Sequence, residues 1–200
     1  AEAFQHSPHL QIWCFPSTNL HLFPELDFLP YEYLSSYSAN AMWGRLQVLA
    51  ALALYKNGGN PRFHPGDAVN AGKPPLMVIS ALAMVTKTIS HQDFASACQV
   101  LRQGMTAEPL SLLREWQFMG YEMENIVEVP GTIYKRGGII DVFSPSSQLP
   151  ARIEFFGNRI ESIRLFQPES QRSSELVNLV VVAPARECLI HDGKYISTLN

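Results

Sequence analysis

The chain has 200 residues, of which 46% are hydrophobic and 16% are charged, and its net charge is −3. This composition excludes a disordered acidic segment, and the near-neutral balance excludes a protein held to nucleic acid mainly by phosphate neutralisation. No apolar run is long enough to span a membrane, and the first residues lack the basic flank and apolar core of a signal peptide. Because the sequence does not begin with Met, we expect a piece of a longer protein.

The first half of the chain predicts an α/β arrangement. Continuous apolar runs at 10–15 and 76–80 predict strands buried on both faces. The Pro-rich, aromatic segment 23–32 predicts a loop, and 81–87 predicts a short helix. The polar segment 57–75 holds four Gly and four Pro, and it predicts disorder.

A helix is predicted from 39 to 56, capped by Ser38 and ended by Asn57-Gly58-Gly59. Apolar residues at helical spacing predict its inward face: Met42, Leu46, Leu49, Ala50 and Ala53.

A second helix is predicted from Thr106, as its cap, to Met119. Pro109 suits its first turn, and Gly120 suits a left-handed stop. Its inward face is predicted to carry Leu110, Leu113 and Trp116.

Short β-rich segments follow, separated by turns too short for crossover connections. They predict an antiparallel sheet with the long helix packed against it, and Gly157-Asn158 predicts one hairpin turn. The predicted strands are 122–129, 132–135, 139–143, 151–156, 160–166 and 176–183.

No motif of catalysis or cofactor binding is present in the sequence. Cys14, Cys98 and Cys188 form no C-x-x-C pair, and this usage suggests free thiols in a reducing cytoplasm. His6 and His9 lack a second pair of metal ligands, so we expect ordinary surface residues. Arg136-Gly137-Gly138 leads into a strand rather than a helix, which favours a tight turn over a phosphate-binding loop. We therefore expect no enzyme activity, cofactor or metal in this chain.

Strand alternation places Arg152, Glu154 and Phe156 on one face, and Tyr134 and Arg136 share a face of a neighbouring strand. Arg and aromatic residues are enriched at binding hot spots. The two charges by themselves indicate a solvated outer face with a weak Arg152–Glu154 ion pair, but Phe156 does not fit that interpretation. A protein-binding patch and a partly covered outer face both stay open at this point.

Basic residues outnumber acidic residues by six to four between 131 and 172. This modest excess suits an acidic protein surface better than duplex DNA. The six basic residues are Lys135, Arg136, Arg152, Arg159, Arg164 and Arg172.

The run Val129-Pro130-Gly131-Thr132-Ile133-Tyr134-Lys135-Arg136-Gly137-Gly138 opens a longer pattern, which continues through Arg152-Ile153-Glu154-Phe155-Phe156-Gly157 and Phe166 to Ser173. This pattern resembles a region shared by the bacterial excinuclease component UvrB and the transcription-repair coupling factors. Leu29-Pro30-Tyr31-Glu32 and Arg45-Leu46-Gln47-Val48-Leu49 favour the coupling factors, because they resemble segments of that family.

The resemblance implies a degenerate ATPase-like α/β domain over 1–103 and an inserted α+β domain over 104–183 that binds UvrA, another component of the excinuclease. Residues 184–200 would return to the first domain. The chain would then be a cytoplasmic adaptor for transcription-coupled nucleotide excision repair. ATP, Mg²⁺, RNA polymerase and double-stranded DNA would belong to other domains of the longer protein.

The resemblance carries partner-binding roles onto Arg136, Arg152 and Phe156. Two departures stand out: Asn158-Arg159 replaces the family's usual acidic pair, and Ser144 replaces a Pro. Two alternatives stay open, namely a fragment of UvrB, which is a DNA-clamping ATPase, and a free-standing interaction module.

Overall fold

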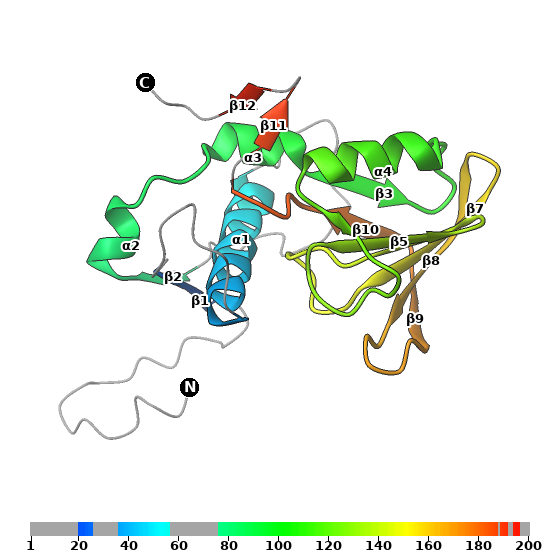
Figure 1. Cartoon of the computed structure of the whole chain (residues 1–200), viewed down its shortest axis with the longest axis horizontal. Helices are drawn as coiled ribbons and strands as arrows, with labels where there is room; N and C mark the ends of the chain where they lie inside the picture. The colour runs from blue at the N-terminus through cyan, green and yellow to red at the C-terminus, as the bar shows by residue number, and fades with distance from the viewer. Residues whose placement is uncertain (1–19, 26–35, 57–75, 188, 192–193, 197–200) are drawn as a thin grey trace.

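The computed structural model describes residues 20–25, 36–56, 76–187, 189–191 and 194–196 (Figure 1). Within this part, no helix is long and apolar enough to cross a membrane. Several predictions fall outside it: those for 10–15, 57–75, His6, His9, Cys14 and Cys188, and residues 26–32 of the predicted loop 23–32.

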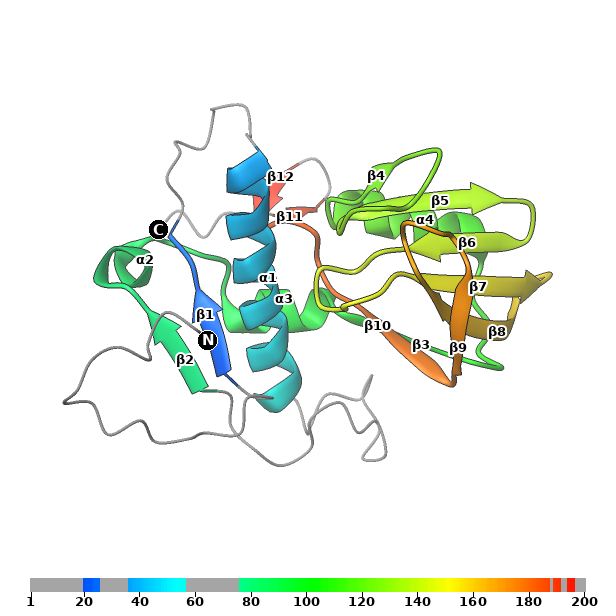
Figure 2. The ribbon, with the colours of Figure 1, turned by 90° about the horizontal axis from the view of Figure 1, so that it is seen from below.

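The N-terminal half gathers around a core built mainly by one long helix. It also contains a parallel two-stranded sheet, whose first strand packs against this helix. A short helix after the second strand and a further helix complete this half at one end of the molecule (Figure 2). Its elements are β1 (Leu20–Phe23), α1 (Ser36–Lys56), β2 (Leu76–Ile79), α2 (Ala81–Val85) and α3 (His91–Ala97).

Helix α1 ends at Lys56 as predicted but begins at Ser36, so Ser38 lies inside the helix and the predicted cap is wrong. Its inward face is confirmed, since Leu46, Leu49, Ala50 and Ala53 are buried and Met42 packs against them.

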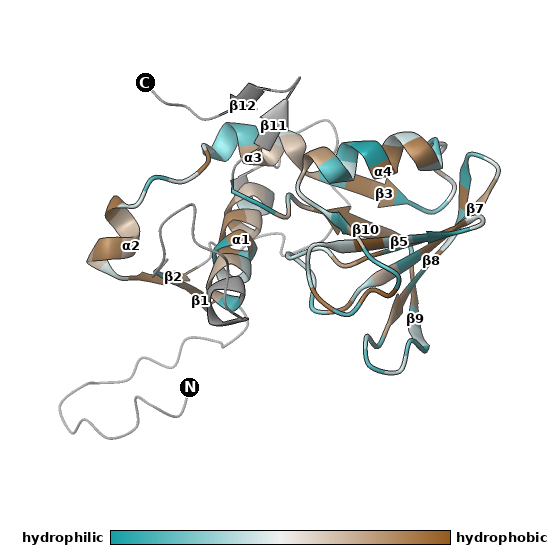
Figure 3. Cartoon of the chain, in the orientation of Figure 1, coloured by the Kyte–Doolittle hydropathy of each residue, from teal (hydrophilic) through white to brown (hydrophobic). Residues whose placement is uncertain are grey.

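Strand β2 exists where a strand was predicted, but the prediction that it is buried is wrong. Its side chains Leu76, Met77 and Val78 are exposed, as are Leu82 and Val85 of the following helix. In Figure 3, β2 and α2 are largely brown, the colour of hydrophobic residues, and they lie at the end of the molecule farthest from the large sheet. A continuous apolar run is typical of a strand that other elements cover on both faces. In this half the long helix α1 packs mainly against β1, so β2 lacks this cover.

The C-terminal half is built on a six-stranded sheet with the order β4-β5-β6-β7-β8-β9. All its neighbours pair antiparallel except β4 and β5. Helix α4 covers one face of this sheet together with the antiparallel β3–β10 ribbon (Figure 1). The strands are β3 (Gln99–Arg102), β4 (Glu122–Met123), β5 (Thr132–Arg136), β6 (Ile139–Val142), β7 (Ala151–Phe156), β8 (Arg159–Phe166), β9 (Ser173–Val177) and β10 (Leu179–Val182).

Helix α4 (Pro109–Phe118) buries Leu112, Leu113 and Trp116. The predicted inward position of Leu110 is wrong, because this side chain is 52% exposed. Gly120 has φ +99°, which confirms the left-handed stop.

The predicted cap at Thr106 is also wrong. Glu108 occupies the N-cap position, and Pro109 begins the helix. A residue before Pro is pushed out of the helical region, so the helix cannot extend further towards the N-terminus. Thr106 instead forms an isolated bridge with Arg159.

Two strand predictions need correction. Only Glu122 and Met123 of the predicted strand 122–129 lie in the sheet, because the chain then leaves it. The predicted strand 176–183 divides at Asn178, since β9 pairs with β8 whereas β10 pairs with β3. The other segments match β5 to β8 closely, and Gly157 at φ +59° confirms the hairpin.

The two halves meet along residues 183–187. Ala183 lies in the core of the first half, and Ala185 lies in the core of the second. A short antiparallel pair follows, β11 (Leu189–His191) with β12 (Lys194–Ile196). The described residues thus form a mixed α/β protein whose sheets are largely antiparallel.

Candidate functional site

The candidate site lies on the face of the six-stranded sheet that is turned away from α4, which we call the outer face. Tyr134, Asp141 and Arg152 are direct cross-strand neighbours on β5, β6 and β7, so their side chains share this face. Arg136, one alternation along β5 from Tyr134, lies on the same face.

Arg152 is held by its own chain. Its Nε and Nη2 atoms donate hydrogen bonds of 2.8 and 2.7 Å to the two carboxylate oxygens of Asp141, and Nη1 donates to the Gln171 carbonyl at 3.3 Å. Its guanidinium lies 4.6 Å from the centre of the Phe166 ring. The hydrogen bonds with Asp141 raise the pKa of Arg152 above its ordinary value. Arg152 is therefore a fixed cation with 22% of its side chain exposed.

A small hydrophobic cluster supports this part of the outer face. Val127, Phe143 and Phe166 are buried there, and Tyr134 packs against them. The interpretation of a partly covered outer face is correct at this end of the sheet. The cluster gives Arg152 an apolar floor and limits the directions from which a ligand can approach it.

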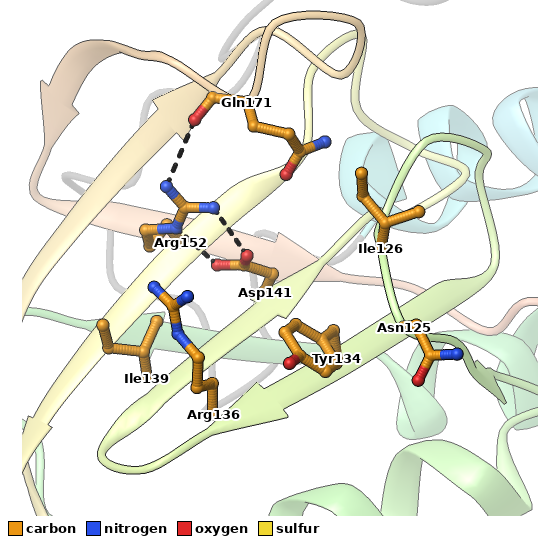
Figure 4. Close-up of a pocket in the computed structure, with 8 residues that line it drawn as sticks. All are labelled: Asn125, Ile126, Tyr134, Arg136, Ile139, Asp141, Arg152 and Gln171. Atoms are coloured by element: carbon orange, nitrogen blue, oxygen red, sulfur yellow. Dashed lines mark hydrogen bonds and ion pairs between the residues drawn. The ribbon is translucent and has the colours of Figure 1, made fainter.

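A cavity of about 360 Å³ opens between the two arginines (Figure 4). Arg136 is exposed at its rim, and among the described residues it has no ion-pair partner. With Arg136 and Arg152 positive and Asp141 negative, the cavity carries one net positive charge. The remaining lining residues are Asn125, Ile126, Tyr134, Ile139 and Gln171.

Phe156 lies at the far end of β7, four residues beyond Arg152 and about 13 Å away at roughly 3.3 Å per residue. It is 80% exposed and borders a separate cavity of about 230 Å³, together with Arg159. The hairpin tip that presents it is held by neighbouring backbone, with Ala107 donating to Asn158 at 2.7 Å and Gly104 donating to Ile160 at 2.8 Å. The structure thus brings Arg136 and Arg152 together but leaves Phe156 at a second point on the same face.

The predicted ion pair between Arg152 and Glu154 is wrong. Cross-strand neighbours lie closer than alternate residues of one strand, so Arg152 pairs with Asp141. Glu154 instead accepts a hydrogen bond of 2.5 Å from Ser162 and lies 3.8 Å from Arg164.

Sequence reasoning missed Asp141, Phe166 and Gln171 as parts of this site. Asp141 had a usable signal, because it is the acidic residue inside the apolar strand Ile139–Val142 and alternates with the buried Ile140 and Val142. Gln171 had none, since only the turn between β8 and β9 places its carbonyl against Arg152.

Residues 100–188 match the family model described as the UvrB interaction domain. The matched residues contain the outer face and both cavities. The chain is 36% identical over 169 residues to the transcription-repair-coupling factor of Myxococcus xanthus, covering 84% of this chain and 13% of that protein. It is 34% identical over 128 residues to that of Bacillus subtilis, covering 62% of this chain and 11% of that protein.

The chain is also 29% identical over 133 residues to UvrABC system protein B of Chlorobaculum tepidum, covering 66% of this chain and 19% of that protein. It therefore resembles the N-terminal, UvrB-like region of the coupling factors, as its motifs indicated. It spans less than a fifth of the length of each of these relatives.

Proposed function

We propose that this chain is an adaptor that recruits the excinuclease component UvrA in transcription-coupled nucleotide excision repair. The observation that carries the proposal is the outer face itself. One face of the sheet packs against α4, while the other presents a cationic cavity and an exposed phenylalanine on a braced hairpin. The match of residues 100–188 to the UvrB interaction domain supports a protein partner.

The chemistry of the outer face favours a partner that offers a carboxylate near an apolar pocket. Arg136 is free to donate charge-assisted hydrogen bonds to that carboxylate, and Arg152 retains guanidinium N–H groups that Asp141 and Gln171 do not use. Phe156 supplies an apolar anchor of the kind that dominates binding hot spots. The net charge of one in the cavity suits a single acidic side chain.

A calorimetric titration with purified UvrA tests the proposal. We expect Arg136→Ala and Arg152→Ala each to weaken binding by about 2 kcal/mol, or roughly 30-fold. Arg114→Ala is the matched control, because Arg114 is an exposed arginine of α4, on the opposite side of the sheet. Wild-type affinity in both outer-face variants would contradict the proposal.

The remainder of the proposal concerns the longer protein. Residues 1–103 would form the first part of a degenerate ATPase-like domain, 104–183 the inserted binding domain, and 184–200 the return. ATP-driven translocation on double-stranded DNA and binding of stalled RNA polymerase would belong to further domains of a cytoplasmic protein, and this chain would need no cofactor. Reading the full open reading frame tests this arrangement, since downstream motor motifs are expected.

A further inference from the structure

Gln171 has an unusual backbone at the edge of the Arg152 cavity. Its φ is +58°, and among the described residues it is the one residue other than glycine with a positive φ. Strained conformations of this kind persist where surrounding contacts enforce them, and they cluster at functional sites. The contacts that Gln171 makes with its neighbours therefore indicate what holds it in this conformation.

Gln171 joins three separate parts of the outer face. Its carbonyl accepts the hydrogen bond from Arg152 (Figure 4). Its side-chain amide donates to the Val127 carbonyl at 3.2 Å, in the loop that carries Asn125 and Ile126, and to the Pro168 carbonyl at 2.7 Å. Its backbone N–H donates to the Gln167 carbonyl at 2.8 Å. The residue thus ties the β8–β9 turn to the opposite wall of the cavity and to the fixed arginine.

We propose that Gln171 is a positioning residue, which orients the Arg152 guanidinium and closes the wall of the cavity that receives the partner's carboxylate. The Asp141 carboxylate accepts hydrogen bonds from two of the guanidinium nitrogens, and the Gln171 carbonyl accepts one from the third. Without the side-chain amide bonds to Val127 and Pro168, the turn that carries the Gln171 carbonyl would loosen, and Arg152 would keep its ion pair but lose its third hydrogen bond. The carboxylate ligand rests on the proposed function, whereas the ordering of Arg152 does not.

Gln171→Gly separates positioning from folding. Glycine adopts positive φ without strain and keeps the backbone carbonyl that accepts from Arg152. The turn is therefore expected to form, while the side-chain amide bonds to Val127 and Pro168 that hold this carbonyl in place are lost. Gln171→Asn keeps an amide and tolerates the left-handed region, so it serves as the conservative rescue. Gln148→Gly is the control, because Gln148 is an exposed loop residue elsewhere.

The first readout needs no partner. Nuclear magnetic resonance measures the exchange of the Arg152 guanidinium protons with water, which we expect to accelerate about tenfold in Gln171→Gly as the cavity wall loosens. Partial recovery is expected in Gln171→Asn and no change in Gln148→Gly. Unchanged exchange in Gln171→Gly would overturn the proposal whether or not the partner binds.

The second readout is a double-mutant cycle on the affinity for UvrA. We expect Gln171→Gly to weaken binding about tenfold in the wild-type background and not at all in the Arg152→Ala background. Equal effects in both backgrounds would overturn positioning through Arg152. Failure of the wild-type chain to bind would overturn the proposed function instead, and proton exchange alone would then decide the role of Gln171.

Discussion

Arg45 of α1 and Glu187 of the returning chain form a two-point ion pair across 142 positions of sequence, with Nε–Oε1 at 2.5 Å and Nη2–Oε2 at 3.0 Å. Arg45 is fully buried, and its guanidinium lies 4.1 Å from the centre of the Phe23 ring. Glu187 also accepts a hydrogen bond of 2.6 Å from Thr88. This ion pair joins residues 183–187, which run from the core of the C-terminal half, to helix α1 in the core of the N-terminal half.

Removing Glu187 is expected to lower the stability of the fold, because it leaves the buried positive charge of Arg45 without its partner. Glu187→Ala should lower the free energy of unfolding by about 3 kcal/mol or more. Thr88→Val removes only the hydroxyl donor and should cost about 1 kcal/mol. Urea denaturation measures both, and equal losses would contradict the structural role given to the ion pair.

The Arg152–Asp141 pair is expected to be specific to arginine. Asp141→Asn should lower the free energy of unfolding by about 2 kcal/mol, since hydrogen bonds to a charged group are lost from a buried position. Arg152→Lys should not preserve the site, because lysine cannot make the two parallel bonds. Glu154→Gln is the control, at about 0.5 kcal/mol or less, because its pair with Arg164 is long and partly exposed and the glutamine oxygen can still accept from Ser162. Denaturation curves that rank Glu154→Gln above Asp141→Asn would refute this assignment.

The stability of the chain is expected to fall in alkaline solution. Burial raises the pKa of Cys98 to about 12 and also raises the pKa of Tyr121, whose hydroxyl donates to the Ala183 carbonyl at 2.6 Å. Above about pH 9 the unfolded thiol ionises while the folded thiol keeps its proton, so stability is lost as pH rises towards the folded pKa.

Each such group contributes a slope of about 1.4 kcal/mol per pH unit within its window. Cys98→Ala should make the free energy of unfolding fall less steeply with pH in the lower part of the alkaline range. Tyr121→Phe should have the same effect at higher pH. The measurement is the free energy of unfolding against pH in a Cys14→Ser, Cys188→Ser background. An unchanged slope in Cys98→Ala would show that the thiol is not shielded as described.

Arg159 lies at the hairpin tip that carries Phe156, as its cross-strand neighbour. If the partner surface is acidic, Arg159→Glu should slow association about fivefold at low salt and less at high salt, because rim charges act mainly through steering. Arg114→Glu on α4 makes the same charge change away from the outer face. Stopped-flow association rates that fall equally in both variants would indicate a net-charge effect rather than a local contact.

The local elements of the second half were predictable because each depends on nearby residues. Ala151–Phe156 matches its predicted strand residue for residue, and Gly120 ends α4 as expected. The contacts that build the site were not predictable, because Asp141 meets Arg152 through strand register and Gln171 meets it through a turn. Helix α3 went unpredicted although its signal was present, since the N-cap Ser90 is followed three residues later by the acidic Asp93, whose backbone N–H donates to the Ser90 hydroxyl.

The most direct test compares Phe156→Ala with Phe118→Ala in calorimetric binding to UvrA. Both side chains are exposed, at 80% and 57%, but Phe156 lies on the outer face and Phe118 on α4. Both substitutions should therefore change the free energy of unfolding by about 0.5 kcal/mol or less. We expect Phe156→Ala to weaken binding at least about tenfold and Phe118→Ala to bind as the wild type does. Loss of binding in Phe118→Ala with wild-type affinity in Phe156→Ala would contradict a docking surface on the outer face.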